Sequence, residues 1–270
     1  MELTAYLKPD VRTIAVVDSQ WGDTGKGKIV DLLASDVDVI ARGTGGPNAG
    51  HTLIVEGEEI VLHAIPIGSR YDRDGKVSII GNGCVVSPTI VEEIDFLLRK
   101  GFTLDHLMIS QDAHVIMPYH VARDRDQHTS LTQGVGSTGR GVGPCYADKI
   151  ARYGVAVRDL YDRDALARKI KSALANYPEQ RVSLDDTIKQ LMPLATKIAP
   201  FIRDTIHEMQ QFQRQGKRIL LEGAQGLLLS IEYGTYPYVT SSDPSINGTA
   251  SGVGLSAQSV DLVLELIKFP

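Results

Sequence analysis

A glycine-rich loop between a short apolar run and a helical segment constrains this chain most strongly. Residues 13–17 are apolar and rich in β-branched side chains, which predicts a buried strand. Residues 22–28 read Gly-Asp-Thr-Gly-Lys-Gly-Lys, and residues 29–33 then have helical character. Strand, glycine loop and helix in this order match the spacing and context of a P-loop. Backbone N–H groups of such a loop, with the N-terminus of the next helix, can bind phosphate oxygens.

Two residues depart from an ordinary P-loop. Ile29 stands where a Ser or Thr hydroxyl usually binds magnesium, so a metal would need another ligand. Asp23 is the candidate, because Mg²⁺ prefers carboxylate, backbone and phosphate oxygens. A carboxylate in a phosphate loop repels phosphate unless a metal or a proton transfer accounts for it. The competing interpretation makes Asp23 a helix N-cap beside two solvated lysines, but the position between a buried strand and a helix favours phosphate binding.

Short β-rich runs alternate with helical segments along the rest of the chain. This alternation predicts an α/β fold of the P-loop type, with a mostly parallel central sheet flanked by helices, a small hairpin and helical insertions. We interpret residues 1–270 as a single domain. Further strands are expected at residues 37–42, 77–80, 107–109 and 218–221, and the hairpin at 53–62. Helices are expected at 88–98, 119–129, 162–176 and 256–268, and across 184–213 with breaks at Pro193 and Pro200.

Composition excludes several classes of function. The net charge of -5 gives no support to a general attraction to nucleic acid or membranes. Cys84 and Cys145 lie far apart, which argues against a disulfide framework or a zinc site and fits a reducing cytoplasm. Residues 1–9 lack the apolar core of a signal peptide, and no apolar run approaches the roughly 20 residues of a membrane span. We therefore expect a cytoplasmic location, with neither nucleic acid nor a membrane as partner.

Other polar segments with glycines supply candidate ligand groups. Residues 48–52 read Asn-Ala-Gly-His-Thr, and residues 136–141 read Gly-Ser-Thr-Gly-Arg-Gly. Residues 222–226 directly follow a predicted strand, and ligands of open α/β sheets gather at such strand ends. Gln225 has both a donor and an acceptor, which suits a purine edge, and residues 235–242 add hydroxyl groups. Each segment alone is also consistent with a surface loop or a strand-end turn.

Together these segments resemble the adenylosuccinate synthetase family. The resemblance rests on residues 19–28, 48–52, 136–144, 222–226 and 234–242, which occur in that family's order, and it covers nearly all of the chain from residue 13. It implies a GTP-dependent ligation of IMP and L-aspartate to adenylosuccinate, through a 6-phosphoryl-IMP intermediate, in AMP synthesis. GDP and phosphate would be the other products.

The resemblance also implies roles for single residues. Asp23 would take the proton from N1 of the hypoxanthine ring, so that O6 attacks the γ-phosphoryl group, and His51 would stabilise and protonate at that group. Gln225 completes the implied catalytic set, and Asp23 with the backbone carbonyl of Gly50 would hold Mg²⁺. The implied nucleotide-binding residues are Gly22, Asp23, Thr24, Gly25, Lys26, Gly27 and Lys28 for GTP, and Asn48, Ala49, Gly50, His51, Thr138, Arg152, Gln225 and Thr240 for IMP. Arg152 would reach the neighbouring site in a homodimer.

The chain departs from the usual family pattern in sequence and in length. Thr24 stands where Glu is usual, Pro47 where His is commoner and Ser230 where Asp is commoner. Family members are considerably longer, and their C-terminal part carries an arginine-rich aspartate loop and a guanine-reading motif that have no counterpart here. We therefore expect a truncated product that is inactive or severely impaired.

Three other functions stay open. A related phage-type synthetase joins aspartate to dGMP, but that branch replaces the loop aspartate by a small hydroxyl residue, so Asp23 favours IMP. A nucleotide-binding paralogue without catalysis is the second, and the presence of both Asp23 and His51 weighs against it. A P-loop GTPase switch is the third, and Ile29 and the lack of an Asn-Lys-x-Asp motif weigh against it.

Overall fold

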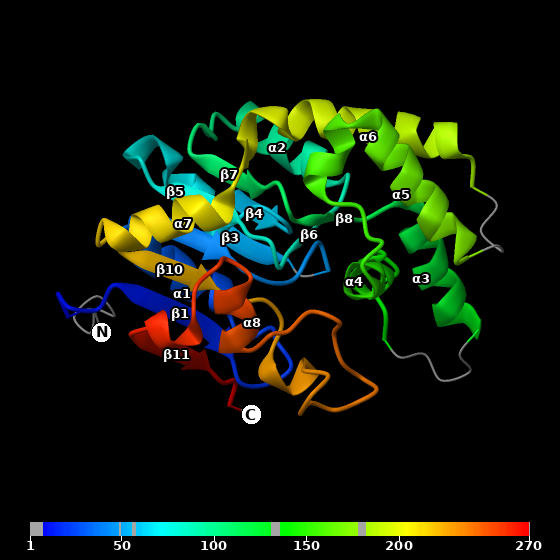
Figure 1. Cartoon of the computed structure of the whole chain (residues 1–270). Coiled ribbons are helices and arrows are strands. Elements are labelled where there is room, and N and C mark those ends of the chain that lie inside the picture. Colours follow the sequence, from blue (N-terminus) through cyan, green and yellow to red (C-terminus); the bar gives the residue numbers. More distant parts are fainter. Residues whose placement is uncertain (1–7, 49, 56–57, 131–135, 178–181, 270) are drawn as a thin grey trace.

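A seven-stranded sheet forms the centre of the computed structural model (Figure 1). The structure describes residues 8–48, 50–55, 58–130, 136–177 and 182–269. The strand order is β11-β1-β10-β2-β5-β7-β9, and every pairing within it is parallel. The strands are β1 (Thr13–Asp18), β2 (Val39–Arg42), β5 (Val77–Ile80), β7 (Leu107–Ser110), β9 (Ile202–Arg203), β10 (Ile219–Glu222) and β11 (Leu262–Leu266). The predicted α/β class with a parallel central sheet is therefore confirmed.

Helices cover both faces of this sheet. Successive side chains of a strand point to opposite faces, so apolar residues on each face pack against a separate layer of helices. In β1, Ile14 belongs to the same buried cluster as Val30 of α1 (Lys26–Ala34), whereas Ala15 belongs to a second cluster with Met209 of α7 (Thr205–Arg214). The first cluster also includes residues of α2 (Ile90–Arg99), α5 (Arg163–Ala175) and α6 (Leu184–Ile198), and the second includes α8 (Ile246–Ser251).

Smaller elements surround the sheet. The predicted hairpin is present as the antiparallel pair β3 (His51–Val55) and β4 (Glu58–Leu62), and its residues 56–57 lie outside the described part of the chain. The remaining elements are β6 (Val85–Val86), β8 (His114–Val115), α3 (Pro118–Ser130), α4 (Val142–Ala151) and the 3-10 segments η2 (Ile67–Asp74), η3 (Val157–Tyr161), η4 (Ala199–Phe201), η5 (Leu227–Leu229) and η6 (Ala257–Ser259). None of the helices in the described ranges has the length and hydrophobicity that a membrane span requires.

Two predictions of secondary structure are wrong. The helix expected at 256–268 is instead η6 followed by β11, which pairs with β1. Leu262 and Leu266 are four residues apart, as on a helix face, but Leu264 between them continues the alternation of a strand. The break expected at Pro193 is also absent, and α6 continues through this residue. Leu191 and Leu194 on either side of it are buried, so packing against the core holds the helix together.

The strand order brings three loops to one place. β10 lies between β1 and β2, so the loops that follow these three strands leave neighbouring positions at the same edge of the sheet. In an open parallel sheet this edge, at the carboxyl ends of the strands, is where ligands bind. The predicted phosphate loop, the polar segment after residue 42 and the segment after Glu222 therefore lie close together.

Candidate functional site

The loop after β1 is organised by the carboxylate of Asp18, the last residue of that strand. Asp18 is 2% exposed. Its Oδ1 accepts hydrogen bonds from the backbone N–H groups of Gln20 at 2.8 Å and Gly22 at 3.3 Å. Its Oδ2 accepts from the hydroxyl of Thr24 at 2.5 Å and from the ammonium of Lys26 at 3.2 Å. One buried carboxylate thus holds both the backbone and the side chains of the predicted phosphate loop.

The backbone of this loop is left-handed at three positions. Gly22, Asp23 and Gly25 have φ values of 95°, 57° and 90°, which suit glycine and which an aspartate tolerates better than most residues do. Gly25 is the N-cap of α1, and no side chain caps this helix. The competing interpretation of Asp23 as an N-cap is therefore wrong. The uncapped first turn of α1 offers its N–H groups to a ligand.

A cavity of about 520 Å³ lies over this loop. It brings together most of the residues predicted for phosphate binding and phosphoryl transfer. Its lining residues are Trp21, Gly22, Asp23, Gly25, Lys26, Gly27, Lys28, Asn48, Gly50, His51, Thr52 and Gln225. Thr24 is not among them, and its hydroxyl is bonded to Asp18. Ala49 lies outside the described residues.

His51, the first residue of β3, rests on a buried carboxylate. Oε1 of Glu222, which ends β10 and is 0% exposed, pairs with Nδ1 of His51 and lies 3.7 Å from Nε of Arg42. Oε2 of Glu222 accepts a hydrogen bond from the N–H group of Ile67 at 3.1 Å. Burial acts to raise the pKa of Glu222, but His51, Arg42 and that N–H group outweigh it and hold the pKa below its usual value. Because Nδ1 faces this carboxylate, Nε2 is the ring nitrogen outside the ion pair.

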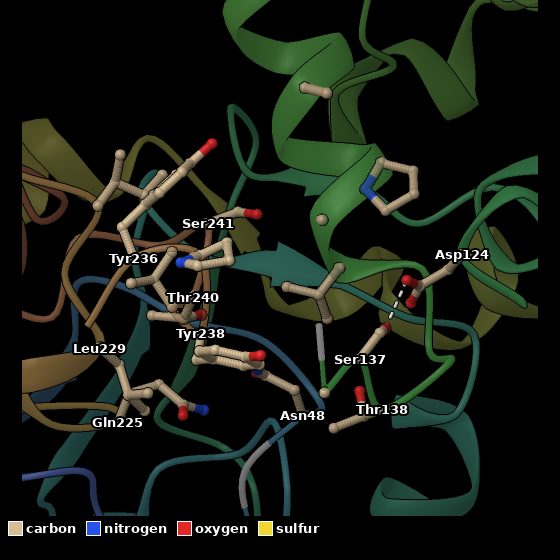
Figure 2. Close-up of a pocket in the computed structure, with 18 of the residues that line it drawn as sticks. Asn48, Asp124, Ser137, Thr138, Gln225, Leu229, Tyr236, Tyr238, Thr240 and Ser241 are labelled. Atoms are coloured by element: carbon tan, nitrogen blue, oxygen red, sulfur yellow. Dashed lines mark hydrogen bonds between the residues drawn. The ribbon is translucent and has the colours of Figure 1, made fainter. Parts of the chain in front are cut away.

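A second cavity, of about 600 Å³, adjoins the first. Asn48 and Gln225 line both cavities. Figure 2 shows Gln225 and Thr240 on one side of the second cavity and Thr138 on the other, with Asn48 between them. Four of the residues predicted for IMP therefore lie around one space next to the phosphate loop, whereas Gly50 and His51 line the first cavity.

The loop that carries Thr138 is held by α3. Asp124 of α3 accepts hydrogen bonds from the hydroxyl of Ser137 at 2.5 Å, drawn in Figure 2, and from the N–H group of Gly141 at 2.8 Å. These two bonds attach both sides of the turn around Thr138 to one carboxylate, which orders the turn against the second cavity.

Two predicted site residues, among those that the structure describes, line neither cavity, and these are Thr24 and Arg152. Thr24 at least belongs to the loop that lines the first cavity. Arg152 is exposed at the C-terminal end of α4, where its φ is 73°. Its implied role at the site of a neighbouring subunit stays a prediction.

Sequence reasoning missed three carboxylates that organise the site. Asp18 and Glu222 each end a parallel strand, and this position at a ligand-binding edge was a usable signal. Asp124 lies within a helix, and its role depends on a loop more than ten residues away in sequence, so its local pattern gave no indication.

The oxygen atoms available at the first cavity fit magnesium. Asp23, which has a carboxylate, and Gly50, which has a backbone carbonyl, both line it. The described residues include no group of three or more His, Cys, Asp or Glu side chains that could hold a metal ion. Two protein oxygens suit Mg²⁺, because this ion usually keeps several waters and takes further ligands from substrate phosphates.

Comparisons with known proteins show the family of this chain. A family model described as adenylosuccinate synthetase matches residues 15–269. The adenylosuccinate synthetases of Streptococcus gordonii and Anaeromyxobacter dehalogenans are 41% and 45% identical to this chain over 95% and 94% of its length. Each alignment covers 61% of the relative, so this chain spans about three fifths of the length of these proteins.

Two solved structures are also similar. The fully ligated adenylosuccinate synthetase of Plasmodium falciparum has a TM-score of 0.84 and 32% identity, covering 94% of this chain and 61% of that one. The succinoaminodeoxyadenylate synthetase of cyanophage S-2L, bound to dGMP and to dATP as an energy donor, has a TM-score of 0.65 and 23% identity. That alignment covers 95% of this chain and 64% of the phage protein, and at this identity it shows the fold alone.

Proposed function

This chain belongs to the adenylosuccinate synthetase family, and on that premise we propose that it acts in the GTP-dependent ligation of IMP and L-aspartate to adenylosuccinate. The observation that carries the proposal is the pair of adjoining cavities that share Asn48 and Gln225. One cavity has a phosphate loop and a histidine, as a triphosphate donor needs. The other has hydroxyl and amide groups, as a purine monophosphate needs.

The proposed chemistry has two steps. The carboxylate of Asp23 takes the N1 proton of IMP, O6 bonds to the γ-phosphorus of GTP, and the bond to the β,γ-bridging oxygen breaks with its electron pair on GDP. The amine of L-aspartate then attacks C6 of 6-phosphoryl-IMP, loses a proton, and displaces phosphate as the C6–O6 bond breaks. Asp23 suits the first step because it lines the cavity on an exposed loop beside the phosphate-binding backbone.

Charge neutralisation accounts for the other groups in the first cavity. Phosphoryl transfer depends on positioning and electrostatic stabilisation more than on covalent chemistry by the protein. In this proposal Lys26 and Lys28 bind phosphate oxygens, and His51 donates a hydrogen bond from Nε2 to the transferring group. Asp23 and the carbonyl of Gly50 would hold Mg²⁺, which would supply further positive charge to the phosphates.

We assign the purine monophosphate to the second cavity, with Thr138 and Thr240 as hydroxyl ligands and Gln225 at the purine edge. The support is that all three line this cavity and that Asp124 orders the turn around Thr138. Arg152 would serve the site of the partner in a homodimer. Its exposed position outside both cavities supports a role beyond its own chain.

Positional isotope exchange in GTP tests the phosphoryl-transfer step without requiring aspartate. GTP labelled with ¹⁸O in the β,γ-bridge is incubated with Mg²⁺ and the 270-residue chain, with or without IMP. We expect the label to scramble into the β-nonbridging positions only when IMP is present. Tight binding of both nucleotides without scrambling would support a nucleotide-binding protein without catalysis. Scrambling with dGMP in place of IMP would assign the chain to the dGMP-using branch.

A further inference from the structure

We propose that Asp18 is a positioning residue that directs the Lys26 ammonium into the cavity over the phosphate loop. The proposal rests on the proposed phosphate-binding function of that loop. Asp18 itself does not line the cavity, so it acts through Lys26 and not by contact with a ligand.

The contacts of Lys26 define where its ammonium points. Lys26 is 6% exposed, and its Nζ donates hydrogen bonds to Oδ2 of Asp18 at 3.2 Å and to the backbone oxygen of Gln225 at 2.5 Å. An ammonium has three N–H donors. With two of them bonded to these acceptors, the third is left for an oxygen in the cavity that Lys26 lines.

The two acceptors of Nζ come from the ends of neighbouring strands. Asp18 ends β1, and Gln225 follows the neighbouring strand β10 with a left-handed φ of 64°. Gly226 lets the two segments approach closely, since a Cβ there would lie 2.7 Å from Oδ1 of Asp18 and 2.3 Å from the backbone oxygen of Gln20. The ammonium direction is thus set before a ligand arrives, which reduces the ordering cost of binding.

Asp18 also favours the charged form of Lys26, which burial disfavours. Burial lowers the pKa of Lys26, and the charge of Asp18 is the largest opposing influence. Burial raises the pKa of Asp18, but hydrogen bonds from Thr24 and Gln20 and the charge of Lys26 outweigh it, so the carboxylate stays ionised. The contacts and the charges therefore favour the same arrangement, an ammonium held between a carboxylate and a carbonyl.

A double-mutant cycle tests the proposal with inorganic tripolyphosphate, a probe that needs only the loop. Affinities are measured by calorimetry without magnesium for the 270-residue chain and for Asp18→Asn, Lys26→Met and the double variant. We expect Asp18→Asn to weaken binding by about tenfold, because a hydrogen bond between charged groups is lost. The isosteric Asn can keep the bonds to Gln20 and Gly22, and the double variant should bind no more weakly than Lys26→Met alone.

Asp261→Asn is the matched control. The carboxylate of Asp261 accepts hydrogen bonds from the N–H groups of Arg12 and Thr13 at the other end of β1, away from the cavity. This variant should lose stability and keep its tripolyphosphate affinity. Unchanged binding in Asp18→Asn, or the same weakening in the Lys26→Met background, would overturn the role of Asp18 and leave phosphate binding by the loop in place. Failure of the unmodified chain to bind would overturn both.

If Asp18→Asn fails to fold, the crystal structure of the unmodified chain with tripolyphosphate decides. We expect Nζ of Lys26 to keep its contacts with Asp18 and Gln225 while it binds a phosphate oxygen. An ammonium that has left Asp18 in the complex would contradict the proposal.

Discussion

The carboxylate of Glu222 faces Nδ1 of His51 inside the protein and joins the end of β10 to the start of β3. The same carboxylate oxygen lies 3.7 Å from Nε of Arg42 in β2. Three elements of the site therefore depend on one buried anion. The arrangement orients a proposed catalytic ring and also stabilises the fold.

Replacing Glu222 by Gln should lower the free energy of unfolding by about 3 kcal/mol, because it leaves the Arg42 charge buried without an anion. Urea denaturation measures the change. Glu232→Gln is the control, since Glu232 is exposed and its neutralisation should change stability by less than about 0.5 kcal/mol. Similar small effects in both variants would contradict the structural importance of the pair.

Asp23→Asn should leave the thermal midpoint nearly unchanged and strongly reduce the effect of magnesium on GTP binding. Asn tolerates a left-handed φ such as the 57° of Asp23, and the side chain is exposed, so the fold loses little. Calorimetry with and without Mg²⁺ measures GTP affinity, and we expect the magnesium-dependent gain to fall by about tenfold or more. A gain equal to that of the unmodified chain would exclude Asp23 as the metal ligand.

Arg152→Gly should stabilise the protein while weakening IMP binding. The φ of 73° at the end of α4 suits glycine, so this change should add about 0.5 to 1 kcal/mol to the free energy of unfolding. The proposed dimer site loses a guanidinium in the same step. Arg152→Leu removes the charge without the backbone gain, and an IMP affinity unchanged in both variants would exclude the shared site.

Stability should fall as the pH drops from about 6.5 to about 4, in part because of His114. Burial, aided by the charges of Lys149 and Lys169, lowers the pKa of His114 from 6.5 to about 4. Between these values the unfolded chain binds a proton that the folded protein does not bind, so stability decreases with falling pH across this window and this residue adds no further loss below it. The contribution is on the order of 3 kcal/mol.

His114→Phe isolates this contribution, because it removes the titrating group and keeps an aromatic ring. The ring of His114 packs closely on Gly154, since a Cβ built on that glycine would lie 2.5 Å from Cδ2 of His114. Urea midpoints from pH 7 to pH 4.5 should decline less steeply in the variant than in the unmodified chain. Parallel declines would show that folding does not lower the pKa of His114. The pKa of His120 is also lowered by burial, but that residue is present in both proteins and cancels in the comparison.

Local sequence was sufficient for strands whose residues are buried on both faces. β5 was predicted to the residue, since residues 77–80 are a short β-rich run before a glycine turn. β11 was not, because Leu262 and Leu266 satisfy the spacing of a helix as well as that of a strand, and only pairing with β1 decides between them. Tertiary context likewise explains why α6 tolerates Pro193.

The candidate site was likewise predictable from local sequence only in part. Glycine loops after strands predicted most residues around the first cavity, since that pattern has a local physical cause. Thr138 and Thr240 of the second cavity were predicted only through the family resemblance. The contacts that organise those loops are not local. Lys26 and the backbone oxygen that it binds at Gln225 are 199 residues apart, and no periodicity relates them. Asp18 and Glu222 acquire their roles only when the sheet has formed.

The insertion of β10 between β1 and β2 has a consequence for the order of events during biosynthesis. β1 and β2 are translated early, yet their shared neighbour begins only at Ile219. A growing chain that has not reached this residue lacks the strand that pairs with both β1 and β2. Its phosphate loop also lacks the backbone oxygen of Gln225 that binds Lys26. Such distant pairings form slowly and expose unpaired strands in the meantime. The nucleotide site therefore cannot be completed before Gln225 has been translated.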